Sequence, residues 1–192
     1  DKKEGLGPSL FHYNFGTVQA KQGNLAASRF HLEKNLKFGN LNGKIYHNLQ
    51  VVKDQLQLND LSRSESLKDK LIDNALVIPA YSLQIITMIL IIIIFLKTLK
   101  KNFKERKLRY IFYFIIAILP LLFDVIYLKN LNYGIVLSKS AVFEGPSRIY
   151  SKINELQAGS KVIIGEKANG WFYIKYPSVL VGWVPRGAIA LY

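Results

Sequence analysis

Few side chains in this sequence could carry out acid–base, nucleophilic or metal chemistry. The 192-residue chain has no cysteine, which excludes disulfides and thiol catalysis, and its only histidines are His12, His31 and His47. Catalysis and metal binding need titratable groups that converge on one point. His12 and His47 come from two matching predicted helices and could approach each other, but no third ligand stands at a suitable spacing. The sequence therefore predicts no enzyme, no cofactor and no metal site.

The net charge of +13 is concentrated in one short segment. KTLKKNFKERKLR, residues 97–109, contains seven Lys and Arg and a single Glu, and it lies between the apolar runs 74–96 and 110–128. A basic chain can bind nucleic acid, but basic residues between two apolar runs are typical of the inner loop of a membrane hairpin. We therefore expect contact with a lipid bilayer and no nucleic-acid partner.

The two apolar runs predict a pair of transmembrane helices. Residues 74–96 carry no charge over 23 positions, and residues 110–128 carry a single acid, Asp124. Runs of about 20 apolar residues are long enough to cross the hydrocarbon core of a bilayer. Pro120 removes one backbone hydrogen bond and should kink the second helix. Asp124 is a candidate functional group within the span, but it also lies close to the outer interface, where a charge costs little.

The positive charge of the loop predicts its side of the membrane. Short basic loops stay in the cytoplasm, so both terminal regions should lie in the periplasm. A translocated N-terminus usually requires a signal peptide. The basic residues of the predicted cytoplasmic loop are Lys97, Lys100, Lys101, Lys104, Arg106, Lys107 and Arg109.

The N-terminal region, residues 1–58, contains a repeated pattern. HYNFGTV (12–18) and YHNLQVV (46–52) match in residue type at an offset of 34 positions. This period, together with the small residues where two helices would meet, resembles the tetratricopeptide (TPR) repeat. The resemblance implies one helical hairpin followed by a capping helix, with a groove that binds peptides. The groove residues it implies are Tyr13, Asn14, Thr17, Lys21 and Asn48, although each could equally be a solvated helix position.

Residues 59–73 alternate in charge without a sustained apolar face. This pattern predicts a polar linker or a short solvated helix.

The C-terminal region, residues 133–192, changes to short runs rich in β-forming residues, separated by Gly, Pro, Asn and Ser. That pattern predicts a small all-β barrel. The GPS turn at 145–147, the LQAGSKVII stretch at 156–164 and the pairs Gly170-Trp171 and Gly182-Trp183 resemble a bacterial SH3 domain. The resemblance implies that exposed aromatic residues bind an extended peptide.

Three aromatic residues are the candidates for that binding surface: Trp171, Tyr173 and Trp183. A period of two places Trp171, Tyr173 and Lys175 on one side of a strand and Phe172 on the other. The alternative is that at least one tryptophan belongs to the core of the barrel or packs against the edge of a strand.

The order of these parts resembles the BatE-type proteins of Bacteroides-aerotolerance (Bat) clusters. The expected fold class is a multi-domain membrane protein with a TPR hairpin and capping helix, a two-helix transmembrane hairpin, and a small SH3-like barrel. The resemblance implies a bacterial inner-membrane protein linked to stress tolerance. Its implied partners are von Willebrand factor A-type membrane proteins and a MoxR-type ATPase. The predicted function is a non-enzymatic scaffold of the cell envelope. The alternative is a membrane anchor that binds peptidoglycan through the SH3 domain.

Overall fold

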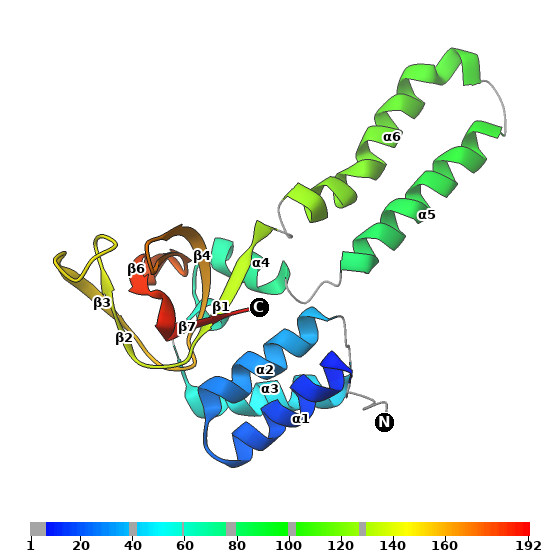
Figure 1. Ribbon diagram of the computed structural model, residues 1–192. Coiled ribbons are helices and arrows are strands. Elements are labelled where there is room, and N and C mark those ends of the chain that lie inside the picture. The colour runs from blue at the N-terminus through cyan, green and yellow to red at the C-terminus, as the bar shows by residue number, and fades with distance from the viewer. Residues whose placement is uncertain (1–6, 39–41, 59, 76–79, 100–102, 127–129) are drawn as a thin grey trace, which may run out of the picture. The chain divides into compact units, whose positions relative to one another are not determined.

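The structure is a computed structural model that describes residues 7–38, 42–58, 60–75, 80–99, 103–126 and 130–192 (Figure 1). The helices are α1 (Pro8–Lys21), α2 (Leu25–Lys37), α3 (Gly43–Leu56), η1 (Leu61–Arg63), α4 (Leu67–Ala75), α5 (Ala80–Leu99), α6 (Phe103–Ile126), η3 (Ser178–Leu180) and η4 (Arg186–Ala188). The strands are β1 (Asn132–Val136), β2 (Ser140–Phe143), β3 (Lys152–Leu156), β4 (Lys161–Ala168), β5 (Trp171–Tyr176), β6 (Gly182–Pro185) and β7 (Ile189–Leu191). The chain divides into two units, Asp1–Val77 with Leu131–Tyr192, and Ile78–Asn130.

In the first unit, three helices form from local signals near the start of the chain. Pro8 opens α1, where its fixed φ suits the first helical turn. The Asn42 side chain caps α3 by accepting a hydrogen bond of 3.0 Å from the Lys44 amide. Leu32 of α2 packs against a stripe of apolar residues on α3, and this contact forms the core of the helical layer. The stripe consists of Ile45, Leu49 and Val52.

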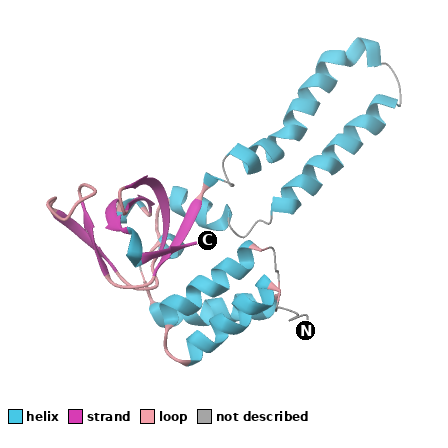
Figure 2. Cartoon of the chain, viewed as in Figure 1, coloured by secondary structure: helices cyan, strands magenta, loops and turns pink. Residues whose placement is uncertain are grey.

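The seven strands of the first unit form one antiparallel sheet in the order β3-β2-β6-β5-β4-β1-β7 (Figure 2). One apolar core receives side chains from every strand, so the sheet curls around that core. Members from successive strands are Val136, Val142, Leu156, Val162, Ile174, Val184 and Ile189. The burial of alternate residues along β5 follows the period of two that the sequence predicts.

The helices and the sheet share a buried interface made largely of charged side chains. Arg29 of α2 is 1% exposed and its Nη1 donates to Asp60 Oδ2 at 2.6 Å and to the carbonyl oxygen of Gly159 at 3.0 Å. Asp60 Oδ2 also accepts from the Lys161 amide on β4 at 2.7 Å. These contacts join three segments that lie far apart in the sequence. Each charged group is buried together with a partner of opposite charge, since burying it alone would be costly.

This interface corrects the predicted fold class. A TPR hairpin would present α2 to further helical repeats, whereas here the face of α2 that carries Arg29 and Glu33 is covered by the sheet. The helices and the sheet form one unit, not two separate modules, so the expected multi-domain architecture with a TPR region is wrong.

The segment between the helices and the hairpin also belongs to this interface. Residues 59–73, expected as a linker, include η1 and the first part of α4. Leu61 and Ile72 are buried with Tyr133 and Ile163 of the sheet. The Tyr133 hydroxyl donates to the Ile72 carbonyl oxygen at 3.1 Å, which holds α4 against the sheet.

The second unit is the antiparallel pair α5 and α6. Over the parts of the chain that the structure describes, no helix combines the length and the apolar character needed to cross a membrane. The predicted spans, the membrane fold class and the location in the bacterial inner membrane with periplasmic ends are therefore contradicted.

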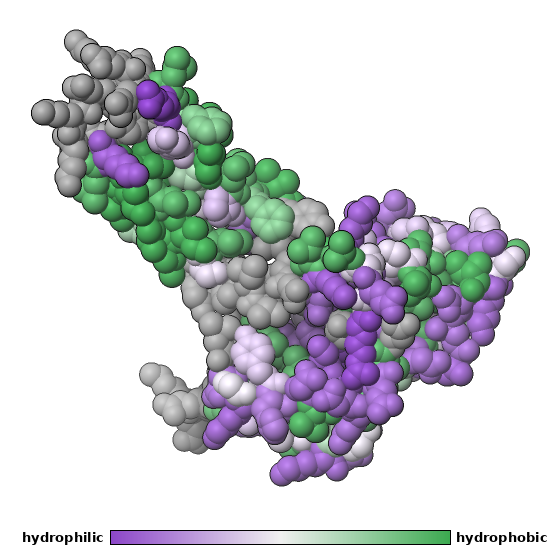
Figure 3. All heavy atoms as spheres, turned by 180° about the vertical axis from the view of Figure 1, so that it is seen from behind, coloured by the Kyte–Doolittle hydropathy of each residue, from purple (hydrophilic) through white to green (hydrophobic). Residues whose placement is uncertain are grey.

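Apolar side chains of this second unit are exposed on both helices, and Figure 3 shows them as a continuous hydrophobic surface. Asp124 of α6 is an exception, since it is 1% exposed and its Oδ2 has no hydrogen-bond partner among the described residues. In the predicted basic loop, Lys97 and Arg109 are exposed. Lys100 and Lys101 lie outside the described residues, as do the side chains of Lys104, Arg106 and Lys107.

Candidate binding face

A two-residue turn sets the position of the first candidate, Trp171. Asn169 and Gly170 connect β4 to β5 with φ values of 35° and 84°. Two consecutive positive φ values are the mark of a tight hairpin turn, and Asn-Gly is the pair that adopts it most easily. The turn pairs Ala168 with Trp171 and so fixes which β5 residues point outward. Phe172 is buried in the core, and Trp171 and Tyr173 are therefore on the opposite, outer face.

The neighbouring strand β6 brings the second tryptophan to the same face. Gly182 comes before Trp183 with a φ of 146°, and a Cβ at this glycine would lie 2.5 Å from Val142 Cγ1. The absent side chain lets β6 approach β2 closely. In the resulting register Trp183 pairs with Tyr173 on one side and with Phe143 on the other.

The outer face of β2, β6 and β5 thus carries a cluster of four aromatic rings. The Phe143 and Trp171 rings meet edge to face with centroids 5.5 Å apart, and the Tyr173 and Trp183 rings are tilted at 5.3 Å. All four are half-buried, and none belongs to the core cluster. We call the surface formed by Phe143, Trp171, Tyr173 and Trp183 the aromatic face.

The structure therefore brings together the three residues that the sequence singled out and adds a fourth. Phe143 was missed because its strand is short and only the pairing of β2 with β6 places its ring near the tryptophans. The sequence offers no local signal for it, because the AVF run at 141–143 is apolar throughout, and its alternation of buried and half-buried positions appears only in the structure. Core placement of either tryptophan, the alternative left open by the sequence, does not occur here.

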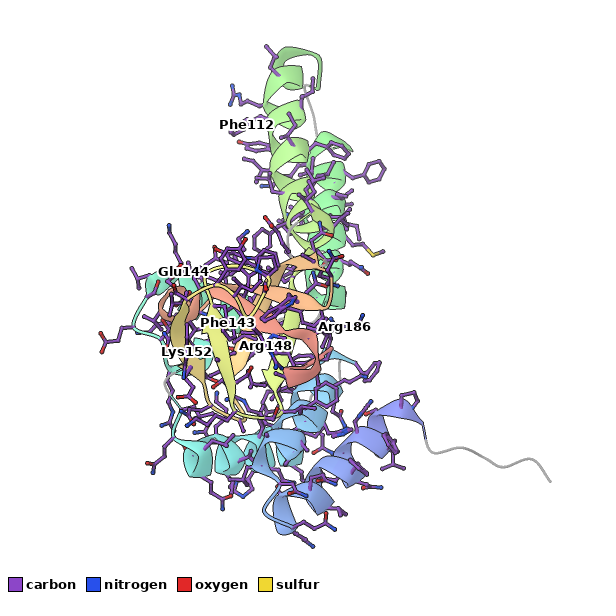
Figure 4. The ribbon with its side chains drawn as sticks, turned by 60° about the vertical axis from the view of Figure 1, so that its left-hand side comes forward. Phe112, Phe143, Glu144, Arg148, Lys152 and Arg186 are labelled. Atoms are coloured by element: carbon purple, nitrogen blue, oxygen red, sulfur yellow. The ribbon has the colours of Figure 1, made fainter. Side chains whose placement is uncertain are left out.

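A positive charge lies beside the aromatic face. Lys175 follows Tyr173 on the outer side of β5 and is exposed. The exposed Arg186 belongs to the other face, because its guanidinium lies over the ring of the core residue Phe172, 5.9 Å from the ring centroid. Figure 4 shows Arg186 at one side of the sheet and Phe143 and Lys152 at the other. A ligand on the aromatic face would meet apolar rings with polar edges, next to the cation of Lys175.

The residues of the predicted TPR groove are less well suited to binding. The Thr17 hydroxyl donates to the Tyr13 carbonyl oxygen at 2.9 Å, and the Asn48 amide donates to Thr17 Oγ1 at 3.3 Å. The first bond lies within α1, and the second joins α3 to α1. Asn14 and Lys21 are exposed on α1. Thr17 and Asn48 thus hold two helices together, and the Tyr13 ring packs against the core of the helical layer.

The histidines pair differently from the sequence-based expectation. His12 lies against His31 of α2, with their Nδ1 atoms 2.7 Å apart, and His47 is exposed on α3. Burial and then the charge of Lys34 lower the pKa of His12. Burial, His12 and Lys34 together lower the pKa of His31 to about 4. No group of three metal-binding side chains occurs within the described part of the chain.

Comparison of the chain with protein-family models, with curated proteins and with solved structures gave no match. The functional argument therefore starts from the geometry of the molecule.

Proposed function

We propose that this protein is a non-catalytic binding protein whose aromatic face holds an extended peptide segment of a partner. The observation that carries the proposal is the cluster of Phe143, Trp171, Tyr173 and Trp183 outside the core of the sheet. A protein surface on which several large aromatic rings lie exposed side by side is usually a contact surface. Aromatic rings also lose little side-chain entropy when they bind, which makes them effective contacts.

The shape and charge of this face favour an extended ligand. The four rings follow three neighbouring strands, so a ligand that crosses them would run across the sheet and touch each ring in turn. Lys175 lies on the same side of β5 as Tyr173 and is exposed. A peptide with apolar residues and an acidic residue near one end would complement this arrangement.

The resemblance to Bat-type proteins supplies specific partners for the proposal. A scaffold of that kind would hold a von Willebrand factor A-type protein or a MoxR-type ATPase through this face. The same rings could contact the stem peptides of peptidoglycan, so the test must separate protein from cell wall.

Site-specific photocrosslinking on the full-length chain separates these cases. A photoreactive phenylalanine analogue at Tyr173 should crosslink to a protein partner in cells, whereas the same analogue at Tyr150, exposed outside the aromatic face, should not. Trp183→Ala introduced together with the Tyr173 probe should abolish the crosslink. In parallel, the purified chain is sedimented with purified sacculi. If the chain sediments with sacculi, loses this sedimentation in Trp183→Ala and forms no protein crosslink, the ligand of the aromatic face is peptidoglycan and not a protein. If neither a crosslink nor sedimentation is observed, the aromatic face is not a binding site.

A further inference from the structure

A cavity lies away from the aromatic face, between the helical layer and β4. Its volume is about 120 Å³. It is lined by Glu33, Leu36, Tyr46, Leu49, Gln50, Lys53, Asp73 and Lys161. These residues come from α2, α3, α4 and β4, so the cavity exists only when the helices and the sheet are assembled.

The helical spacing of the lining residues explains how the cavity forms. On α3, Tyr46, Leu49, Gln50 and Lys53 recur at intervals of three and four residues, which places them on one face of the helix. On α2, Glu33 and Leu36 are three positions apart and share a face in the same way. Each helix thus offers the cavity at least one leucine and one charged side chain.

The buried end of the cavity is strongly polar. Lys161 Nζ lies 3.2 Å from Glu33 Oε2, with side chains only 4% and 5% exposed, and it also forms an ion pair with Asp73 Oδ1. The Tyr192 hydroxyl donates to Glu33 Oε2 at 3.2 Å, which leaves this carboxylate well satisfied. Asp73 is different, because Lys161 is its single partner among the described residues and its side chain is 17% exposed. Its Oδ2 remains able to accept a hydrogen bond from a ligand.

The lining of the cavity also includes a second cation. Lys53 of α3 is half-buried, and its Nζ forms no ion pair within the described residues. Its charge reaches the carboxylates of the cavity, since it contributes to lowering the pKa of Glu33. Burial itself opposes ionisation of Glu33, and Lys161 and Arg29 are the main charges that overcome it. The cavity thus presents an available carboxylate oxygen, an available ammonium and two leucines.

These charges disfavour ligands that carry only a positive or only a negative charge. A simple anion would be attracted by Lys53 but would meet the carboxylates of Glu33 and Asp73, and a simple cation would meet Lys53 and Lys161. A ligand that carries both charges satisfies both sides. We propose that this cavity binds a free L-α-amino acid with a small apolar side chain, its ammonium on Asp73 and its carboxylate on Lys53. The side chain lies against Leu36 and Leu49.

The test compares L-valine with analogues that each lack one charge, using titration calorimetry on the full-length chain. L-valine should bind in the millimolar range or tighter, and L-valinamide and N-acetyl-L-valine should each bind at least about tenfold more weakly, because each leaves one charged group without its partner. If L-valinamide, which lacks the carboxylate, binds as tightly as L-valine, then Lys53 does not hold a carboxylate. Absence of binding by L-valine and by L-alanine would overturn the proposal.

Variants then assign the two ends of the ligand. Lys53→Gln should remove the preference for valine over valinamide, whereas Lys44→Gln, at an exposed position on the same helix, should keep it. Asp73→Asn should remove the preference over N-acetylvaline. Because Asp73→Asn also breaks the ion pair with Lys161, its folding is checked by circular dichroism. If Asp73→Asn unfolds, the comparison of L-valine with L-valinamide and N-acetyl-L-valine on the unchanged chain decides whether the cavity binds both charges. Neither result depends on the aromatic face, so the two proposals fail independently.

Discussion

Lys161 Nζ lies 3.2 Å from Glu33 Oε2, and this contact joins the first residue of β4 to the middle of α2. Both side chains are almost fully buried. Arg29 contacts the same carboxylate through Nε at 3.5 Å, so Glu33 lies between two cations. The helical layer and the sheet are therefore held together by charges that lie far apart in the sequence.

Replacement of Lys161 should destabilise the contact between the helical layer and the sheet. Lys161→Met leaves Glu33 and Asp73 without their shared cation, and breaking a buried ion pair in this way typically costs about 3–5 kcal/mol. Urea unfolding should report a loss of that size. Lys167→Met, at an exposed position of the same strand, should change stability by less than about 0.5 kcal/mol. Equal effects of the two variants would show that the buried network contributes little to folding.

Stability should fall in acid because of the histidine pair. The pKa of His31 is lowered from 6.5 to about 4 in the folded chain, by burial, His12 and Lys34. The unfolded chain therefore takes up a proton that the folded chain does not, and stability is lost as the pH falls from about 6.5 to about 4 and then levels off.

The measurement for this effect is the melting temperature across that pH range. His31→Gln should flatten the slope, and His47→Gln, at an exposed position of α3, should leave it unchanged. The groups around the pair are the ammonium of Lys34 and the rings of Phe11, Phe15, Phe30 and Phe38. A slope that is the same in all three proteins would place the acid sensitivity elsewhere, for example in Glu33.

The aromatic face should contribute less to folding than the core beneath it. Phe172→Ala removes a buried ring and should cost about 3–5 kcal/mol, whereas Trp183→Ala removes a half-buried ring and should cost about 1–2 kcal/mol. Guanidinium unfolding of both variants gives the comparison. A loss for Trp183→Ala as large as that for Phe172→Ala would make the ring a structural element, and the binding role of the face would lose its main support.

The close approach of β6 to β2 should not tolerate a side chain at Gly182. A Cβ there would lie 2.5 Å from Val142 Cγ1 and 2.9 Å from the Phe143 carbonyl oxygen. Gly182→Ala should therefore destabilise the sheet by about 2–4 kcal/mol through overpacking and an unfavourable φ. Gly187→Ala, where a Cβ would meet nothing within 4 Å, is the matched control. A stability change in Gly182→Ala no larger than that in the control would mean that β6 can move away from β2.

The aromatic face was largely predictable from the sequence because its information is local. The alternation of Trp171, Phe172 and Tyr173 follows the period of a strand, and Asn169-Gly170 is a strong turn signal. Phe143 was not predictable, since its position depends on the pairing of two strands that are far apart in the chain.

The buried charge network could not be predicted for the same reason. Arg29 and Glu33 have the spacing of an ordinary exposed ion pair on a helix, and no local pattern distinguishes a buried pair from a solvated one. Their partners come from distant segments: Asp60 from a polar stretch, and Lys161 from the start of an apolar strand, where a lysine would be expected in solvent. The alternating charges near Asp60 and Asp69 predicted a solvated linker, although both side chains are 1% exposed.

The hairpin of α5 and α6 separates the two halves of one packed unit in the order of synthesis. Arg29, Glu33 and Asp60 emerge from the ribosome long before Lys161, so two carboxylates share a single cation in the meantime. The newly made helices must keep this polar face in contact with water until the last strands arrive. The N-terminal third cannot bury this polar face by itself. Assembly of the protein is therefore completed only after its C-terminal third has been made.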